Sequence, residues 1–168
     1  MQFSNIASPG MTPQNMWDLH CKIEELLARD DVAGVVVTHG TDTLEETSFF
    51  LDITAKSQKP VVCTAAMRGA SDISPDGPYN IYCSVKTAAS PQAVGMGVMV
   101  CLDEILQAPG EVMKTHSANP ATFQSPWWGP IGYVDIDHIV WRRKVLGVKR
   151  FHPQALTARV DLILSLIH

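Results

Sequence analysis

The 168-residue sequence lacks the features that mark several large classes of protein. Its charged residues make up 18% of the chain and leave a formal net charge of only −4. A surface for nucleic acid or anionic membrane needs a clustered basic patch instead. No apolar run approaches the roughly 18 residues of a membrane helix, and residues 1–5 lack the layout of a signal peptide. We therefore expect a cytoplasmic protein with no nucleic-acid or membrane partner.

Motifs for metal and redox chemistry are also missing. The four cysteines (Cys21, Cys63, Cys83 and Cys101) show no CxxC spacing, and the six histidines form no HExxH pair. Cys63 and Cys101 lie inside apolar strand-like runs, which indicates buried thiols. The sequence therefore predicts no metal site.

The residues that are present alternate between helix and strand patterns. Thr12-Pro13 marks a helix start, and apolar residues then recur at helical spacing to about Arg29. Apolar runs predict buried strands at residues 34–39, 60–65 and 95–102, with helices at 43–56 and 79–89 between them. This order predicts an α/β fold in which a mainly parallel sheet is flanked by helices.

Reactive side chains concentrate between the first strand and the second helix. Ligands of open parallel sheets bind beyond the carboxyl ends of strands, where helix N-termini also point. Residues 38–43 occupy this position, and Gly40 permits a tight turn or the close approach of a ligand. Thr41 and Asp42 are therefore candidate functional residues, and ordinary turn chemistry is the alternative.

The second helix carries its own start signal. Thr43 and Glu46 match the T-x-x-E capping box, which predicts a helix from there to about Lys56. With Thr43 as the cap, Thr41 and Asp42 are not needed for that purpose.

Lys114 is the other candidate, about a dozen residues beyond the third strand. A lysine at such a place is usually a solvated surface charge. If it reaches Thr41 and is partly shielded from water, it can act as a base or polariser for the hydroxyl.

Residues 38–47, Thr-His-Gly-Thr-Asp-Thr-Leu-Glu-Glu-Thr, resemble the second signature of bacterial-type L-asparaginases and glutaminase-asparaginases. Other segments agree with that family in order and spacing, namely residues 5–8, 59–62, 66–68, 76–80, 112–116, 121–123 and 129–132. The resemblance implies hydrolysis of the side-chain amide of L-asparagine, and often L-glutamine, to the acid and ammonia. It also implies a threonine nucleophile, no metal or other cofactor, and a homo-oligomer that is a dimer of dimers in the full-length family.

The resemblance assigns roles residue by residue. Thr41, Lys114 and Asp42 match the Thr-Lys-Asp cluster of the family. Thr41 would be activated by Lys114 or would orient a water, and Asp42 would hold the α-ammonium group of the substrate. Ser8 resembles the serine that binds the α-carboxylate, and the backbone of Ala66 would line the amide end. The substrate would thus be held by its amino-acid head and presented amide first.

Two family features are absent from the 168 residues. A Thr-Gly-Gly-Thr-Ile segment supplies the nucleophilic threonine in the family, and a mobile loop with a tyrosine follows it, but neither occurs here. Pro9 and Pro109-Gly110 also depart from the family pattern, which leaves the substrate preference open. We therefore expect a partial chain with little or no activity alone.

The sequence also predicts a domain organisation. Residues 1–141 would form most of an N-terminal α/β domain, ending in a small hairpin that turns at residues 135–137. Residues 142–159, basic and with a proline, would form a linker, and residues 160–168 the first strand of a C-terminal domain.

Three alternatives remain at this point. The chain could be a non-catalytic binding module that retains Ser8 and Asp42 to capture an amino acid. It could be the asparaginase-like subunit of a tRNA amidotransferase, or an α/β domain with no ligand site.

Overall fold

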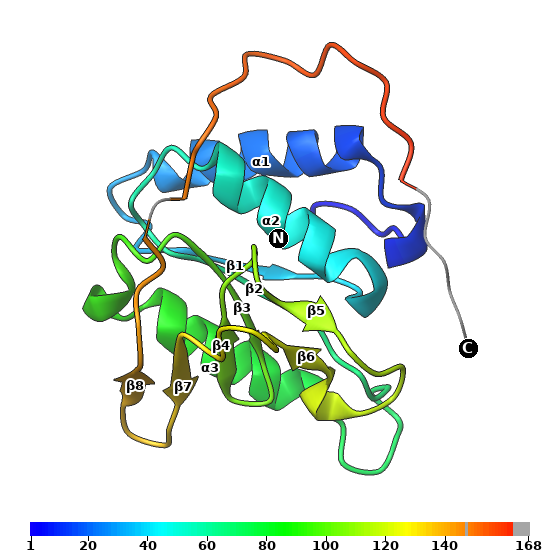
Figure 1. The fold of residues 1–168 in the computed structure, drawn as a ribbon, viewed down its shortest axis with the longest axis vertical. Coiled ribbons are helices and arrows are strands. Elements are labelled where there is room, and N and C mark those ends of the chain that lie inside the picture. The colour runs from blue at the N-terminus through cyan, green and yellow to red at the C-terminus, as the bar shows by residue number, and fades with distance from the viewer. Residues whose placement is uncertain (147, 163–168) are drawn as a thin grey trace.

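The computed structural model describes residues 1–146 and 148–162, and its centre is a six-stranded sheet (Figure 1). In spatial order the strands are β1 (Val35–Thr38), β2 (Val61–Thr64), β3 (Val98–Leu102), β4 (Ile105–Gln107), β7 (Gly132–Val134) and β8 (Ile139–Trp141). β1, β2 and β3 are parallel, and β4, β7 and β8 extend the sheet in antiparallel pairs. The predicted α/β class is confirmed, with a sheet that is mixed.

The change from parallel to antiparallel occurs at the turn between β3 and β4. Asp103 and Glu104 both have positive φ, 52° and 64°, and they join residues that pair directly across the hairpin. Two left-handed residues in succession match the twist of a tight hairpin, so the chain returns immediately instead of entering a crossover helix.

In the described residues, three α-helices cover the two faces of the sheet (Figure 1). They are α1 (Pro13–Leu27), α2 (Leu44–Thr54) and α3 (Gly77–Ala88). Alternate residues of β2 enter opposite cores: Val61 and Cys63 pack with α1 and α2, whereas Val62 packs with α3. None of the helices in the described part of the chain is long and apolar enough to cross a membrane.

The first helix begins as the sequence predicts. The Thr12 hydroxyl accepts a hydrogen bond from the Asn15 amide at 3.2 Å, and the Asn15 side chain accepts one from the Thr12 amide at 3.0 Å. This reciprocal box, with Pro13 as the first helical residue, satisfies amide groups that the helix itself leaves without partners.

The capping box predicted for the second helix is wrong. The Thr43 side chain makes no capping hydrogen bond and instead donates to the carbonyl oxygen of Ser8 at 2.8 Å. Residues 41–43 form a 3-10 turn that leads into α2. The tertiary contact with Ser8 therefore replaces the local cap.

A small two-stranded ribbon and short 3-10 turns complete the described part of the fold. A ribbon of β5 (Met113–Lys114) and β6 (Phe123–Gln124) stands apart from the main sheet. The 3-10 turns are η1 (Ser8–Gly10), η2 (Thr41–Thr43), η3 (Pro91–Ala93) and η4 (Pro120–Thr122).

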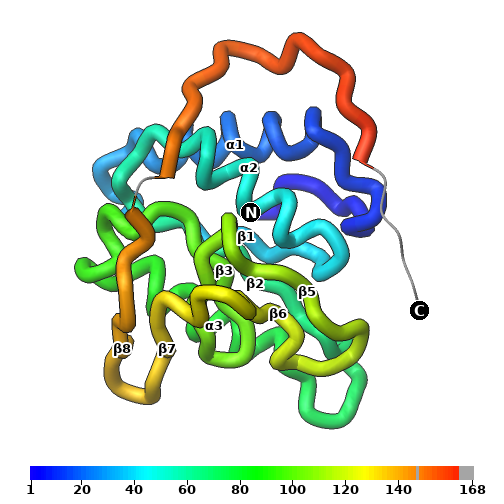
Figure 2. The backbone as a smooth tube through the Cα atoms, in the orientation of Figure 1, coloured from blue at the N-terminus to red at the C-terminus, as the bar shows by residue number. Residues whose placement is uncertain are grey.

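Beyond β8, residues 142–146 and 148–162 form neither helix nor strand. The Phe151 amide donates to the carbonyl of Ile53 at 2.6 Å, and Arg150 pairs with Asp52 at 3.6 Å, so the segment runs back over α2 (Figure 2). Arg143 pairs with Glu111. Most of the strand predicted at 160–168 lies outside the described residues.

The two predicted buried thiols are confirmed, since Cys63 and Cys101 are completely buried. Burial raises the pKa of each thiol to about 12, which makes them inert structural side chains.

Leu106→Ala should destabilise the domain because Leu106 is fully buried in the core beneath α3. We expect the free energy of unfolding in urea to fall by about 2–5 kcal/mol. Leu146→Ala is the matched control, since Leu146 is 82% exposed, and its effect should stay within about 0.5 kcal/mol. Equal effects of the two substitutions would contradict this core.

Candidate functional site

The candidate site lies at the carboxyl edge of the parallel strands. β1 ends at Thr38, Gly40 leads into the 3-10 turn of residues 41–43, and α2 follows at Leu44. The turn thus presents Thr41 and Asp42 where a parallel sheet exposes its strand ends beside a helix N-terminus.

The structure brings Lys114 to these two residues from more than 70 positions along the chain. Its Nζ lies 2.9 Å from Thr41 Oγ1 and 2.7 Å from Asp42 Oδ1. The side chains of Lys114 and Asp42 are 21% and 32% exposed, so the pair is shielded but reachable. An ammonium that donates to a hydroxyl oxygen stabilises the negative charge that develops when the hydroxyl loses its proton.

Ser8 belongs to the same cluster. Its hydroxyl accepts a hydrogen bond from the Asp42 amide at 3.2 Å, and its carbonyl accepts from the Thr43 hydroxyl. Gly40 makes this contact possible, because a Cβ at position 40 would lie 2.5 Å from Ser8 Oγ. The φ of Gly40 is −82°, so close approach, and not backbone conformation, requires glycine here.

Ala66 lies at the same edge but outside the hydrogen-bonded cluster. Thr38 of β1 is in register with Thr64 of β2, so Ala66 and Gly40 follow their strands at the same level. Ala66 is exposed. Among the described residues, no hydrogen bond joins it to the four other predicted site residues.

Asp76 fixes the turn that carries Ala66. Its carboxylate accepts hydrogen bonds from the amides of Met67 at 3.0 Å and Arg68 at 2.9 Å, and from Asn80 Nδ2 at 3.1 Å. Burial alone would raise the pKa of Asp76, but these donors outweigh it and hold the pKa below its usual value. The ionised carboxylate therefore fixes the backbone of this turn by hydrogen bonds.

The His39 ring supports the turn between β1 and α2 through two hydrogen bonds. Its Nδ1 lies 2.7 Å from the Gly40 carbonyl, and its Nε2 lies 3.1 Å from the Thr47 hydroxyl. Because a carbonyl can only accept, Nδ1 carries the hydrogen and Nε2 accepts from Thr47. Burial lowers the pKa of His39, so the ring is a neutral brace at physiological pH.

Sequence reasoning missed three of these supporting groups. His39 and Asp76 were recognised only as parts of matching segments, and Glu45 binds the Lys114 backbone across 69 positions. Acidic residues at the first turn of a helix are common, so no local signal distinguished Glu45.

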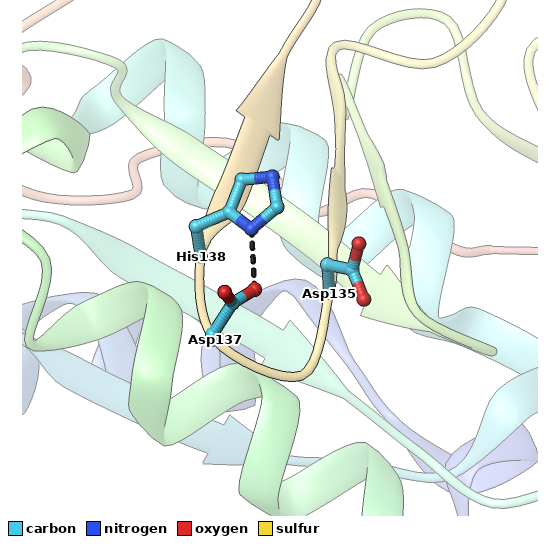
Figure 3. Close-up of side chains that lie close together, drawn as sticks. All are labelled: Asp135, Asp137 and His138. Atoms are coloured by element: carbon cyan, nitrogen blue, oxygen red, sulfur yellow. Dashed lines mark hydrogen bonds and ion pairs between the residues drawn. The ribbon is translucent and has the colours of Figure 1, made fainter.

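One group of side chains in the described chain has the spacing of metal ligands. Asp135, Asp137 and His138 lie within 4.8 Å of one another at the tip of the β7–β8 hairpin (Figure 3). All three are exposed, and the ammonium of Lys86 already donates to the carbonyls of Asp135 and Ile136. Asp137 is already paired with His138, and exposed acidic groups such as these are common without an ion.

A groove of about 1000 Å³ follows the edge of β1 that no other described strand pairs with. It runs between residues 1–6 and α1, and it ends at residues 38–40, next to the site. The amides of Val35 and His39 bond to the β2 side. By strand alternation, the amides of Val36 and Thr38 face the groove.

The fold and the cluster together define an α/β domain with a lysine-held hydroxyl and carboxylate at its sheet edge. Residues 1–146 match the family described as asparaginase, N-terminal. L-asparaginase 2 of Bacillus subtilis is 44% identical over 136 residues, which are 81% of this chain and 36% of that protein. The glutaminase-asparaginase of Pseudomonas fluorescens is 39% identical over 142 residues, 84% of this chain and 39% of that protein.

A solved structure agrees with these relatives. The crystal structure of a probable cytoplasmic L-asparaginase from Campylobacter jejuni aligns with a TM-score of 0.85 and 40% identity, over 91% of this chain and 49% of that chain. The chain belongs to the asparaginase family. It spans less than half the length of these relatives.

Gly40→Ala should disturb the site because the new methyl group would collide with Ser8. We expect a loss of about 1–3 kcal/mol in the free energy of unfolding, as in other overpacked positions. Gly10→Ala is the control, since its Cβ would meet Ile6 at an ordinary 3.5 Å. A neutral Gly40→Ala variant would show that Ser8 does not pack against the turn as described.

Proposed function

We propose that this chain supplies the Lys114–Thr41–Asp42 part of an L-asparagine amidohydrolase site. The observation that carries the proposal is the Lys114 ammonium, which lies within hydrogen-bond distance of both Thr41 Oγ1 and Asp42 Oδ1. Lysine at this position is the partner that a hydroxyl needs if it is to lose a proton or orient a water.

The neighbouring groups suit the head of an amino acid. The carboxylate of Asp42 is only partly satisfied by Lys114 and can also hold an α-ammonium group. The Ser8 hydroxyl accepts from the Asp42 amide and keeps its own hydrogen to donate to an α-carboxylate. The turn that Asp76 holds would place the backbone of Ala66 beside the side-chain amide.

Hydrolysis then requires attack on the carbon of this amide. If a hydroxyl oxygen adds to the carbon, its proton passes to the amide nitrogen, ammonia leaves, and a water then cleaves the resulting ester to give the acid and restore the hydroxyl. If a water adds directly, its proton passes to the amide nitrogen, and ammonia leaves together with the acid. Positioning of the substrate and stabilisation of the developing charge would supply most of the rate.

The family resemblance places a second, nucleophilic threonine in a Thr-Gly-Gly-Thr-Ile segment, which these 168 residues do not contain. We propose that an extended segment of this kind completes the site by lying in the groove along β1. The amides of Val36 and Thr38 that face the groove would pair with this segment. One end of the segment would then lie beside residues 38–40.

Several properties of the whole protein are part of the same proposal. The substrate is L-asparagine or L-glutamine, the assembly is a homo-oligomer, and the location is the cytoplasm. Residues 1–141 form most of the N-terminal α/β domain, and residues 142–159 form a linker. No cofactor is required.

A second candidate function is a non-catalytic module that captures an amino acid. Ser8 and Asp42 are held together by hydrogen bonds that need no further segment. Such a module would bind L-asparagine without hydrolysing it.

Ammonia release from L-asparagine and L-glutamine tests the proposal. The purified chain should release little alone. It should release more when mixed with a synthetic peptide that contains a Thr-Gly-Gly-Thr-Ile segment. Lys114→Met should then lower the rate by about 10²–10³-fold, as expected when a charge-stabilising donor is lost.

Two controls define the outcomes. Lys56→Met removes an exposed lysine outside the groove and should keep the rate, and a peptide with alanine in place of its threonines should give no gain. Calorimetric binding of L-asparagine with no turnover under any condition would establish the binding module instead. Neither binding nor turnover would refute both functions.

A further inference from the structure

The support of Lys114 is unusual because its strand is not part of the main sheet. β5 pairs with β6 in a separate ribbon, and each strand has only two residues. On the β6 side, Gln107 anchors the ribbon by donating to the Phe123 carbonyl at 3.1 Å. That anchor does not by itself fix Lys114 relative to Thr41 and Asp42.

Val112 and Phe123 pack in the core beside α2, and among the hydrogen bonds of the described residues one side chain reaches the Lys114 backbone from α2. Glu45 Oε2 accepts a hydrogen bond from the backbone amide of Lys114 at 2.6 Å. Glu45 lies in the first turn of α2, directly after the 3-10 turn that carries Thr41 and Asp42. One turn of the chain therefore holds both the backbone and the side chain of Lys114.

We propose that Glu45 is a positioning residue, which fixes the backbone of Lys114 so that its ammonium reaches Thr41 and Asp42. The inference deepens the proposed function, on which it rests for its consequence in catalysis. Glu45 acts through Lys114, and the described contacts give it no bond to Thr41 or Asp42.

The contact uses the backbone of Lys114 and leaves the ammonium free. Lys114 Nζ has three N–H donors, of which one goes to Thr41 and one to Asp42. If Glu45 accepted a hydrogen bond from the ammonium, it would compete with Thr41 and Asp42 for the N–H donors. By accepting from the amide, it places the side chain and leaves a third donor for a substrate or a water.

The electrostatic environment supports this role. Glu45 is half-buried, and burial raises the pKa of its carboxyl, while the Lys114 amide hydrogen bond acts in the opposite direction. A carboxylate kept partly out of water makes a strong charge-assisted hydrogen bond. Glu45 also attracts the positive charge of Lys114.

Chemical labelling of Lys114 tests the proposal without requiring activity. Limited acetylation of the purified chain, followed by mass spectrometry, gives the reaction rate of each lysine. In Glu45→Ala the ammonium should leave Thr41 and Asp42, and the rate at Lys114 should rise by about five-fold, the change that one lost hydrogen bond produces. Glu45→Gln keeps an acceptor oxygen and should stay within about two-fold of the wild type.

Controls keep the test specific. Glu25→Ala removes an exposed glutamate that pairs with Lys22, and it should leave the rate at Lys114 unchanged. Circular dichroism identifies any variant that fails to fold, in which case all lysines would react faster and Glu45→Gln would decide. Two outcomes would overturn the proposal. One is that folded Glu45→Ala has the wild-type acetylation rate at Lys114. The other is that Glu45→Gln raises this rate as much as Glu45→Ala does.

Activity assays separate this inference from the proposed function. In the peptide-completed chain, Glu45→Ala should lower kcat by about ten-fold with little change in KM, and Glu45→Gln should restore it. An active wild type whose kcat is unaffected by Glu45→Ala would overturn the positioning role alone. An inactive wild type would refute the proposed function, and the labelling result would still decide how Lys114 is held.

Discussion

The hydrogen bonds of the Lys114 ammonium are the interaction on which the site depends. They join a ribbon outside the main sheet to the turn between β1 and α2, two segments that are more than 70 residues apart in the chain. A partly buried ion pair costs desolvation energy, and good geometry with additional hydrogen bonds is needed to offset that cost. Here the Thr41 hydroxyl and the Glu45–Lys114 contact supply those bonds.

Close packing around the turn between β1 and α2 holds Thr41 and Asp42 in place for Lys114. Gly40 lets Ser8 approach, and Ser8 in turn accepts from the Asp42 amide. His39 braces the Gly40 carbonyl from within the same segment. Each of these contacts removes freedom from the turn before any substrate binds, which is how a preorganised site reduces the entropy that binding would otherwise cost.

Much of the scaffold could be predicted from local patterns, because apolar periodicity and the Thr12 cap act over a few residues. The sequence also predicted that the segment around Thr41 follows the first strand, and it lies there in the structure. Contacts between distant residues could not be predicted: Thr43 bonds to Ser8 instead of capping α2, and Glu45 binds the Lys114 amide. The left-handed turn at Asp103 and Glu104, which makes the sheet mixed, lacks the glycine or asparagine that usually signals it.

A double-mutant cycle between Lys114 and Asp42 tests the central claim most directly. The free energy of unfolding in urea would be measured for wild type, Lys114→Met, Asp42→Ala and the double variant, with Arg29 and Asp31 as an exposed reference pair. The account predicts a favourable coupling of about 0.5–1 kcal/mol or more for Lys114 and Asp42. Effects that add within about 0.3 kcal/mol would show that the two residues do not interact, and would contradict the account.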